Sequence, residues 1–241
     1  MNKTCLSLIN IEKTIGQKKI LSDISFSLEN NEIVGLLGPN GAGKTTAFYV
    51  AAGLMFPNQG KVLINNTDVT NKPMHARANL GLSYLPQESS LFPDLSVENN
   101  LFGIAELLKL DHENIMQKVA KIVDEFDLTK ILKIKGRMLS GGQRRKVEIA
   151  RTLICEPKIV LLDEPFAGID PIAVEEIKEL LLEITKKNIS ILITDHNVRE
   201  TLSLCEKAII LSNGMIIGEG DEESLKQNAH VKKEYFGKMF Y

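Results

Sequence analysis

Residues 32–45 read EIVGLLGPNGAGKT, an apolar run that leads directly into a glycine-rich loop. The run EIVGLLG lacks polar alternation, which is typical of a strand covered on both faces of a parallel sheet. The loop fits the pattern G-x-x-x-x-G-K-[ST] through Gly38, Gly43, Lys44 and Thr45. A strand, this loop and a following helix predict an α/β fold in which backbone N–H groups surround phosphate at a helix start.

The loop predicts a nucleotide phosphate site with a metal ion. We expect Lys44 to bridge the terminal phosphates and Thr45 to offer its hydroxyl to Mg²⁺. The residues expected to contact the nucleotide here are Gly38, Pro39, Asn40, Gly41, Ala42, Gly43, Lys44, Thr45 and Thr46.

Composition is that of an ordinary soluble globular protein. The chain has 241 residues, 44% hydrophobic and 25% charged, with a net charge of -2. This balance argues against nucleic acid as a partner. No run of 18 apolar residues is present, and the first residues lack the pattern of a secretory signal. We therefore expect a cytoplasmic location unless partners hold the chain elsewhere.

The pattern along the chain predicts one α/β domain with an inserted helical lobe. The first thirty residues alternate as half-buried antiparallel strands do. Residues 96–155 are predicted to be helical, because apolar residues such as Ile115, Val119 and Ile122 fall on one helix face. Buried strands return at 158–164 and 190–196, and a helix beginning at Asp170-Pro171 connects them. The predicted core therefore comprises 1–95 and 156–241.

Two adjacent carboxylates end the strand KIVLLDE. A buried pair such as Asp163 and Glu164 is costly unless a cation or a proton transfer compensates it. In nucleotide hydrolases with this loop the first acid holds Mg²⁺, and an acid beside it can activate the attacking water. We expect Asp163 to be linked to the metal and Glu164 to be the general base.

Two further polar residues fall near the predicted site. Gln87, in YLPQE, lies between the phosphate loop and the helical lobe, where its amide could meet Mg²⁺ or water. His196 follows the strand ILIT, at the sheet edge where ligands collect in parallel sheets. We expect His196 to sense the terminal phosphate.

A second glycine loop, LSGGQ, precedes the predicted helix RRKVEIARTLI. Its residues Ser140, Gly141, Gly142 and Gln143 offer a helix N-terminus but no lysine and no metal-binding hydroxyl. The loop is therefore interpreted as half of a site, which a second copy of the chain completes in a two-fold dimer. Asp170 is expected at the dimer boundary, with helix capping as the alternative. Residues 144–146, RRK, are interpreted as a solvated face.

The motifs GPNGAGKTT, Gln87, LSGGQ, IVLLDE, GID and TDH resemble the nucleotide-binding subunit of ABC transporters across nearly the whole chain. The resemblance implies ATP and Mg²⁺ as ligands, and a RecA-like P-loop core with an antiparallel β subdomain and a helical lobe. It also implies a homodimer that closes on ATP, and two transmembrane permease subunits that dock in a groove near Phe92. Membrane contact would then be indirect, on the cytoplasmic face of the inner membrane.

More specific wording points to a branch of the family. MHARANLGLSYLPQESSLF (74–92), LLDEPFAGIDP, ITDHNVRET (193–201) and HVKKEYFG are similar to the ATPase subunits of lipopolysaccharide exporters. The alternatives are a branched-chain amino-acid importer ATPase and, less well supported, a soluble ATP-dependent clamp or a small-molecule kinase. A clamp would need a coiled-coil insertion or tandem cassettes, and a kinase would leave LSGGQ unexplained.

The chain departs from the family pattern in two places that affect binding. Ile15 occupies the position where relatives supply an aromatic residue to stack on adenine, so only aliphatic packing on the base is expected. Pro93 and Asp94 follow Phe92 where relatives carry basic residues, which puts the charge of the docking groove in doubt.

Two sets of less specific residues are expected to be structural. Three cysteines, Cys5, Cys155 and Cys205, are too far apart for a zinc site and are interpreted as reduced, mostly buried thiols. The apolar tail residues are expected to pack on the chain itself or on the second copy: Val231, Tyr235, Phe236, Met239 and Phe240.

Overall fold

Two sheets form the framework of the computed structural model, which describes residues 3–237. A four-stranded antiparallel sheet has the order β2-β1-β4-β5, and a six-stranded sheet has the order β10-β9-β3-β8-β7-β6. The larger sheet is parallel from β9 to β6, and β10 pairs with β9 antiparallel at its edge. The predicted α/β class with an antiparallel β subdomain is confirmed.

The strands are β1 Thr4–Ile15, β2 Lys18–Glu29, β3 Ile33–Leu37, β4 Gln59–Ile64, β5 Thr67–Asp68, β6 Leu82–Leu85, β7 Ile159–Asp163, β8 Ser190–Thr194, β9 Lys207–Ser212 and β10 Met215–Gly220. The α-helices are α1 Lys44–Ala52, α2 Met74–Ala78, α3 Val97–Ala105, α4 His112–Glu125, α5 Gly141–Leu153, α6 Pro171–Thr185, α7 Val198–Leu204, α8 Glu222–Gln227 and α9 Ala229–Val231. Short 3₁₀ turns cover Glu106–Leu108, Thr129–Ile131 and Gly136–Met138, and a π turn covers Lys232–Phe236.

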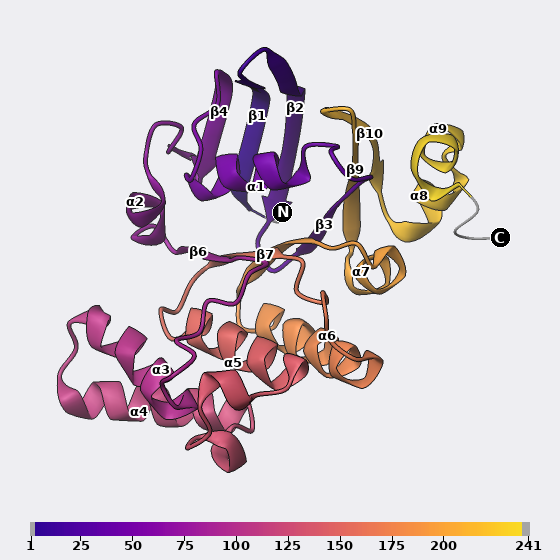
Figure 1. Cartoon of the computed structure of the whole chain (residues 1–241). Coiled ribbons are helices and arrows are strands. Elements are labelled where there is room, and N and C mark those ends of the chain that lie inside the picture. The colour runs from indigo at the N-terminus through magenta and orange to yellow at the C-terminus, as the bar shows by residue number, and fades with distance from the viewer. Residues whose placement is uncertain (1–2, 238–241) are drawn as a thin grey trace.

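The six-stranded sheet is covered on both faces, as its apolar strands predict. In β7, Val160 and Leu162 face the core formed with helices α3–α6, whereas Ile159 and Leu161 face α1 and the antiparallel sheet. This alternation follows from the two-residue period of a strand. Figure 1 shows the resulting layers, with α1 beside β1, β2 and β4 and the helices α3–α6 below the larger sheet.

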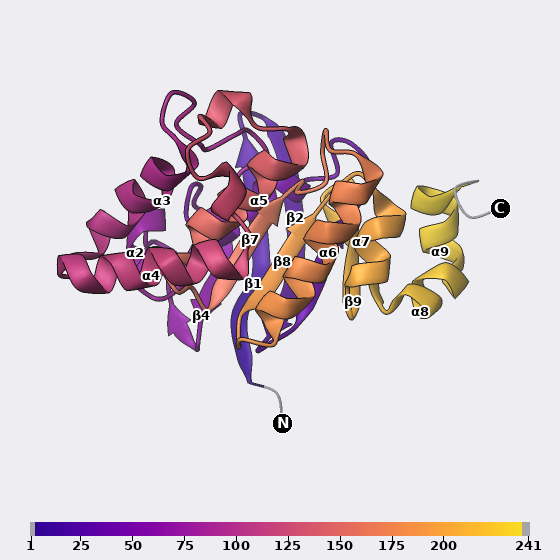
Figure 2. The same ribbon diagram turned by 90° about the horizontal axis from the view of Figure 1, so that it is seen from below.

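Helix α3 starts after Ser96, whose hydroxyl accepts a hydrogen bond from Asn99 N. Helix α4 buries Ile115, Val119 and Ile122 as expected from their spacing. These side chains belong to the same core as one face of the large sheet. Figure 2 shows α4, α5 and α6 lying across this face. The lobe is therefore packed on the sheet rather than connected only by its chain ends.

The tail packs on the chain itself. Val231 and Phe236 are buried with Leu37, and Tyr235 is partly buried in the same cluster. Burial raises the pKa of Tyr235 to about 12. Met239 and Phe240 lie outside the described residues. Contacts within the chain account for the burial of Val231, Tyr235 and Phe236, so packing on a second copy is not needed to explain it.

The cysteine prediction is confirmed for Cys5, which is buried, and Cys205 is partly buried. It is wrong for Cys155, which is exposed because it follows the last turn of α5 at the surface. No helix within residues 3–237 is both long and apolar enough to cross a membrane.

Candidate active site

The phosphate loop requires its glycines at two positions for lack of space. Gly38 has a φ of 151°, and an added Cβ would lie 2.1 Å from the Leu211 carbonyl oxygen. Gly43 has a φ of 106°, and its added Cβ would lie 2.7 Å from Leu21 Cδ2. Side chains at these positions would displace the loop from β9 and β2. The loop is thus held by its packing in the turn that precedes α1.

Lys44, the first residue of α1, folds back over this loop. Its Nζ donates hydrogen bonds to the carbonyl oxygens of Gly38 at 2.7 Å and Pro39 at 3.1 Å. Burial lowers the pKa of Lys44, and the nearby charges of Glu164 and Asp163 oppose that shift. A positive charge is therefore fixed beside the loop and within the field of both predicted acids.

A cavity of about 400 Å³ lies over the loop, large enough for part of a nucleotide. The residues that line it are Lys18, Ile20, Asn40, Gly41, Ala42, Gly43, Lys44, Thr45, Thr46, Glu164 and His196. The predicted phosphate loop, base and phosphate sensor are therefore brought together. Ile15 is about half exposed and does not line this cavity, although its cross-strand neighbour Lys18 does. The contact of Ile15 with a base stays a prediction.

Glu164 is the centre of the polar contacts in the site. His196 Nε2 lies 2.7 Å from its Oε1, and the side-chain nitrogen of Gln87 donates to its Oε2 at 2.7 Å. Glu164 also has a φ of 48°, the left-handed region that residues with a Cβ rarely adopt. A carboxylate with a histidine and an amide as neighbours can orient a water molecule and accept its proton.

Asp163 is 4% exposed, and the Tyr84 hydroxyl donates to its Oδ2 at 3.2 Å. Burial raises the pKa of Asp163, and burial together with the charge of Asp163 raises the pKa of Tyr84. A buried carboxylate with one neutral side-chain donor is suited to a cation. With the Thr45 hydroxyl it supplies oxygen ligands of the kind that Mg²⁺ prefers.

The protein does not supply a complete metal cage. Within the described part of the chain, no group of three or more His, Cys, Asp or Glu side chains is placed to hold a metal ion. Mg²⁺ usually keeps water and substrate phosphate in its shell, so Asp163 and Thr45 fit it as a partial set. Gln87 donates its amide to Glu164 in this structure, and its role as a metal ligand stays a prediction.

The second glycine loop is built as a helix start. The Ser140 side chain accepts from Gln143 N, and the Gln143 side chain accepts from Ser140 N, which completes a capping box. An added Cβ on Gly141 would lie 2.9 Å from the Gly168 oxygen, and one on Gly142 would lie 2.5 Å from Ala173 Cβ. These glycines are thus required for packing on the chain's own start of α6.

The two glycine loops line different cavities. A second cavity of about 230 Å³ is lined by Gln87, Ser89, Gly141, Arg144, Arg145, Glu148, Glu164, Ala167, Gly168 and Ile169. Glu164 borders both spaces, but none of the residues 140–143 borders the phosphate cavity. Asp170 caps α6 through hydrogen bonds from Ile172 N and Ala173 N, so its capping role is observed and its role at a dimer boundary is not tested.

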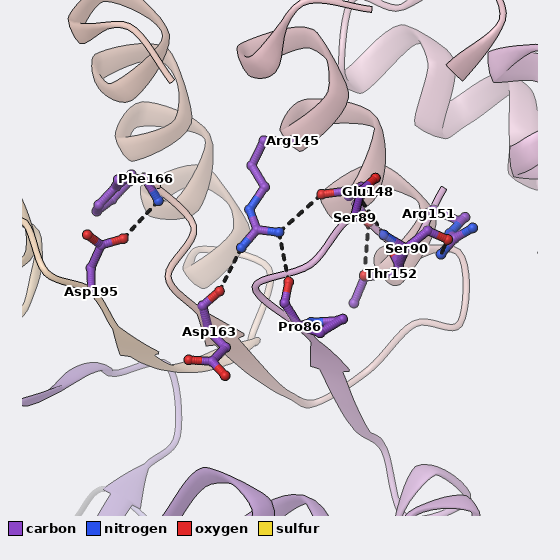
Figure 3. A network of polar contacts seen from close by, with 10 residues as sticks. All are labelled: Pro86, Ser89, Ser90, Arg145, Glu148, Arg151, Thr152, Asp163, Phe166 and Asp195. Carbon is purple, nitrogen blue, oxygen red and sulfur yellow. Dashed lines mark hydrogen bonds and ion pairs between the residues drawn. The ribbon is translucent and has the colours of Figure 1, made fainter. Parts of the chain in front are cut away.

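The interpretation of RRK as a solvated face is wrong for Arg145. Its side chain is buried against Glu148, and Figure 3 shows it between the backbone of Asp163 and that of Pro86. Sequence reasoning also missed Glu148. The signal was available, because an Arg and a Glu three residues apart on a helix can pair, and the residues on either side of Glu148 are apolar.

Asp195 is a second residue that sequence reasoning missed. It is buried, and its carboxylate accepts hydrogen bonds from Phe166 N at 2.8 Å and Asn197 N at 2.8 Å. Figure 3 shows the contact with Phe166. Asp195 thereby connects the loop after Glu164 to the turn that carries His196. This connection helps to set the distance between the Glu164 and His196 side chains.

The chain is similar to known ATP-binding proteins of ABC transporters. A family model described as ABC transporter matches residues 21–167. The lipopolysaccharide export system ATP-binding protein LptB of Haemophilus influenzae is 47% identical over 98% of this chain and 98% of its own length. LptB of Escherichia coli strain K12 is 44% identical over the same shares of both chains.

Solved structures show the same fold. The ADP conformation of an ATP-binding cassette of an ABC transporter has a TM-score of 0.87 and 30% identity, and the match covers 97% of this chain and 99% of that one. The dimeric post-hydrolysis state of another ATP-binding cassette, bound to ADP and Pi, has a TM-score of 0.78 and 24% identity, and the match covers 90% of this chain and 98% of that one. The second likeness bears on the fold alone.

Proposed function

The chain belongs to the ABC transporter ATP-binding family, and we propose that it is the ATPase subunit of a lipopolysaccharide exporter. The observation that carries the proposal is the 47% identity to LptB over nearly the full length of both chains. The phosphate loop, Glu164 and His196 around one cavity supply the machinery for hydrolysis. The site geometry does not identify a cargo, so the named relatives support this part of the proposal.

The chemistry assigned to the site is attack of water on the terminal phosphate of ATP. The loop amides and Lys44 bind the phosphates, and Glu164 accepts the proton of the attacking water. His196 and Gln87 orient Glu164 through their contacts with its two oxygens. Bound Mg²⁺, held by Asp163 and Thr45, would neutralise charge on the phosphates.

We assign the second glycine loop to the phosphate site of another copy of the chain. The loop does not border its own phosphate cavity, although its helix N-terminus has the N–H groups that suit an anion. Closure by a two-fold related copy brings each loop to the opposite cavity. Two solved cassettes with this fold are dimeric, which is compatible with the proposal.

Light scattering tests this assignment on a background that cannot hydrolyse ATP. Glu164→Gln protein is expected to double its mass with ATP and Mg²⁺ and to stay a monomer with ADP. Adding Ser140→Arg on that background should keep it a monomer, because the new side chain blocks the shared site. Gly141 is a poorer choice, since any side chain there clashes with Gly168 of the same chain. A dimer that forms equally well with Ser140→Arg would refute the assignment.

The transport role places the chain on the cytoplasmic face of the inner membrane through permease subunits. Phe92 supports a docking surface near it, because the ring is 53% exposed and lies 5.7 Å from the Arg151 guanidinium. The charge there is mixed, since Asp94, two residues after Phe92, pairs with Arg137 at 2.7 Å.

A pull-down from detergent-solubilised membranes tests the cargo. Tagged Glu164→Gln protein is expected to recover lipopolysaccharide-export permease subunits, and Phe92→Ala should reduce their recovery by about tenfold, the effect of losing an aromatic anchor. Leu182→Ala serves as a control, because it removes another exposed apolar side chain, on α6. Recovery of branched-chain amino-acid permeases instead would overturn the proposed cargo.

A further inference from the structure

An ion pair on α5 is buried beside the active site. Arg145 is 5% exposed and Glu148 is 2% exposed, and Arg145 Nη1 lies 3.1 Å from Glu148 Oε2. Taking two charges out of water is costly unless other hydrogen bonds satisfy them. The other hydrogen bonds of Arg145 and Glu148 therefore indicate the role of the buried pair.

Arg145 holds two peptide groups, each of which leads into a residue of the site. Its Nη2 donates to the Asp163 carbonyl at 2.8 Å, and that peptide continues into Glu164. Its Nη1 donates to the Pro86 carbonyl at 3.0 Å, and that peptide continues into Gln87. Figure 3 shows the guanidinium between these two carbonyl groups. One rigid group thus fixes the backbone before both Glu164 and its partner Gln87.

Glu148 fixes the other side of Gln87. Its Oε1 accepts a hydrogen bond from the Ser89 hydroxyl at 2.6 Å and from Ser90 N at 3.0 Å. The segment around Gln87 is therefore held to α5 both before and after that residue. The Gln87 amide reaches Glu164 Oε2 from this fixed segment at 2.7 Å.

The peptide between Asp163 and Glu164 has both of its polar groups bound. Its carbonyl accepts from Arg145, and its N–H donates to the Thr194 oxygen at 2.7 Å. Glu164 needs such support because its φ of 48° is unfavourable for a residue with a side chain. Without Arg145 this peptide would be held only by its N–H bond to Thr194, and its carbonyl would lose its donor.

We propose that Arg145, paired with Glu148, is a positioning residue that sets the geometry between Glu164 and Gln87 for hydrolysis. The proposal rests on the role of Glu164 as the base. An apolar pair of similar size could fill the same space without these hydrogen bonds, and such replacements are often neutral for stability. The role of the pair is thus to hold the side chains of the site in place, because displacements near 1 Å strongly affect the rate of hydrolysis.

The test measures kcat and KM for ATP on the full purified chain. The double variant Arg145→Met with Glu148→Gln leaves no unpaired charge, and the glutamine oxygen can still accept from Ser89 and Ser90. We expect kcat to fall by roughly 10- to 100-fold while KM changes less than about threefold. In a Gln87→Ala background the same double variant should have a smaller effect on kcat, because only the hold on the Glu164 peptide is then left to lose.

A second variant decides the question if the double variant does not fold. Arg145→Lys keeps the charge beside Glu148, but a single ammonium cannot replace the planar fork that holds both carbonyls. We expect its kcat to fall by roughly 3- to 10-fold at unchanged KM. The control is Lys118→Met with Glu156→Gln, which removes an ion pair between α4 and the turn after α5, outside both cavities.

Measuring Glu164→Gln alongside separates a failure of the proposed function of Glu164 from a failure of the positioning role of Arg145. If Glu164→Gln hydrolyses ATP normally, the proposed function of Glu164 fails. If Glu164→Gln is inactive while folded Arg145 variants keep the wild-type kcat, the positioning role alone is overturned. A kcat loss that is equally large with and without Gln87 overturns the positioning of Gln87 and leaves only the hold on the Glu164 peptide.

Discussion

Glu164→Gln is expected to lower ATP hydrolysis by about 10² to 10⁴-fold, the usual contribution of a general base. Glutamine has nearly the same shape as glutamate, but it cannot accept the proton of the attacking water. The contacts from His196 and Gln87 converge on the two carboxylate oxygens, and the phosphate loop is a separate segment. ATP should therefore still bind. Phosphate release and fluorescent-nucleotide titration measure the two effects.

The control for this experiment is Glu183→Gln on α6, which removes an exposed carboxylate that forms an ion pair with Lys186. Its hydrolysis rate should stay at the wild-type level. A Glu164→Gln protein that turns over ATP at the wild-type rate would disprove the assignment of the base. Loss of ATP binding in Glu164→Gln would instead show that the carboxylate supports the phosphate loop.

Arg77→Met should destabilise the chain by about 3 to 5 kcal/mol, because several buried carbonyl groups would lose their donor. Arg77 is fully buried, and its Nη1 donates to the Val50 oxygen at 2.6 Å and the Ala51 oxygen at 2.7 Å, in the last turn of α1. Its other nitrogens donate to the Lys72 and Thr70 carbonyls. Burial lowers the pKa of Arg77 to about 10, which leaves the guanidinium charged at neutral pH.

Urea denaturation of the apo chain measures this effect, with Arg137→Met as the matched control. Arg137 also bonds at 2.7 Å, but to exposed Asp94, so its removal should change the free energy of unfolding by less than about 1 kcal/mol. The free energy of unfolding of Arg77→Lys should lie between those of Arg77→Met and wild type, because lysine keeps the charge but lacks the planar guanidinium group with its several donors. Equal stability of Arg77→Met and wild type would show that water satisfies the four carbonyl groups.

The relation between Arg77 and the site is indirect. Helix α1 begins at Lys44, and Arg77 binds its C-terminal carbonyl groups, where a positive charge complements the helix dipole. Arg77 lies in the short helix α2. Its burial could not be read from MHARA, since the side chain is buried by α1 and by the loop at 70–72.

Local patterns were sufficient for the elements that carry the site. The apolar run before GPNGAGKT predicts β3, and Asp170-Pro171 predicts the start of α6, because strand burial and helix capping depend on neighbouring residues. The grouping of the phosphate loop with Glu164 and His196 was predictable as well. Parallel strands in one sheet place their carboxyl ends, and the residues that follow them, along one edge.

The tertiary structure alone decided which charges are buried and which loop reaches which cavity. Arg144 and Arg145 are adjacent residues of the same type. Arg144 is partly exposed, whereas Arg145 binds the backbone before Glu164 and Gln87. The position of LSGGQ was likewise decided by the tertiary structure. The motif predicts a phosphate contact, but within its own chain it borders the second cavity and not the phosphate cavity. Burial and cavity lining depend on segments more than 50 residues apart, such as Pro86 and Arg145. No local period encodes how such segments meet, because their contact is set by the packing of the whole core.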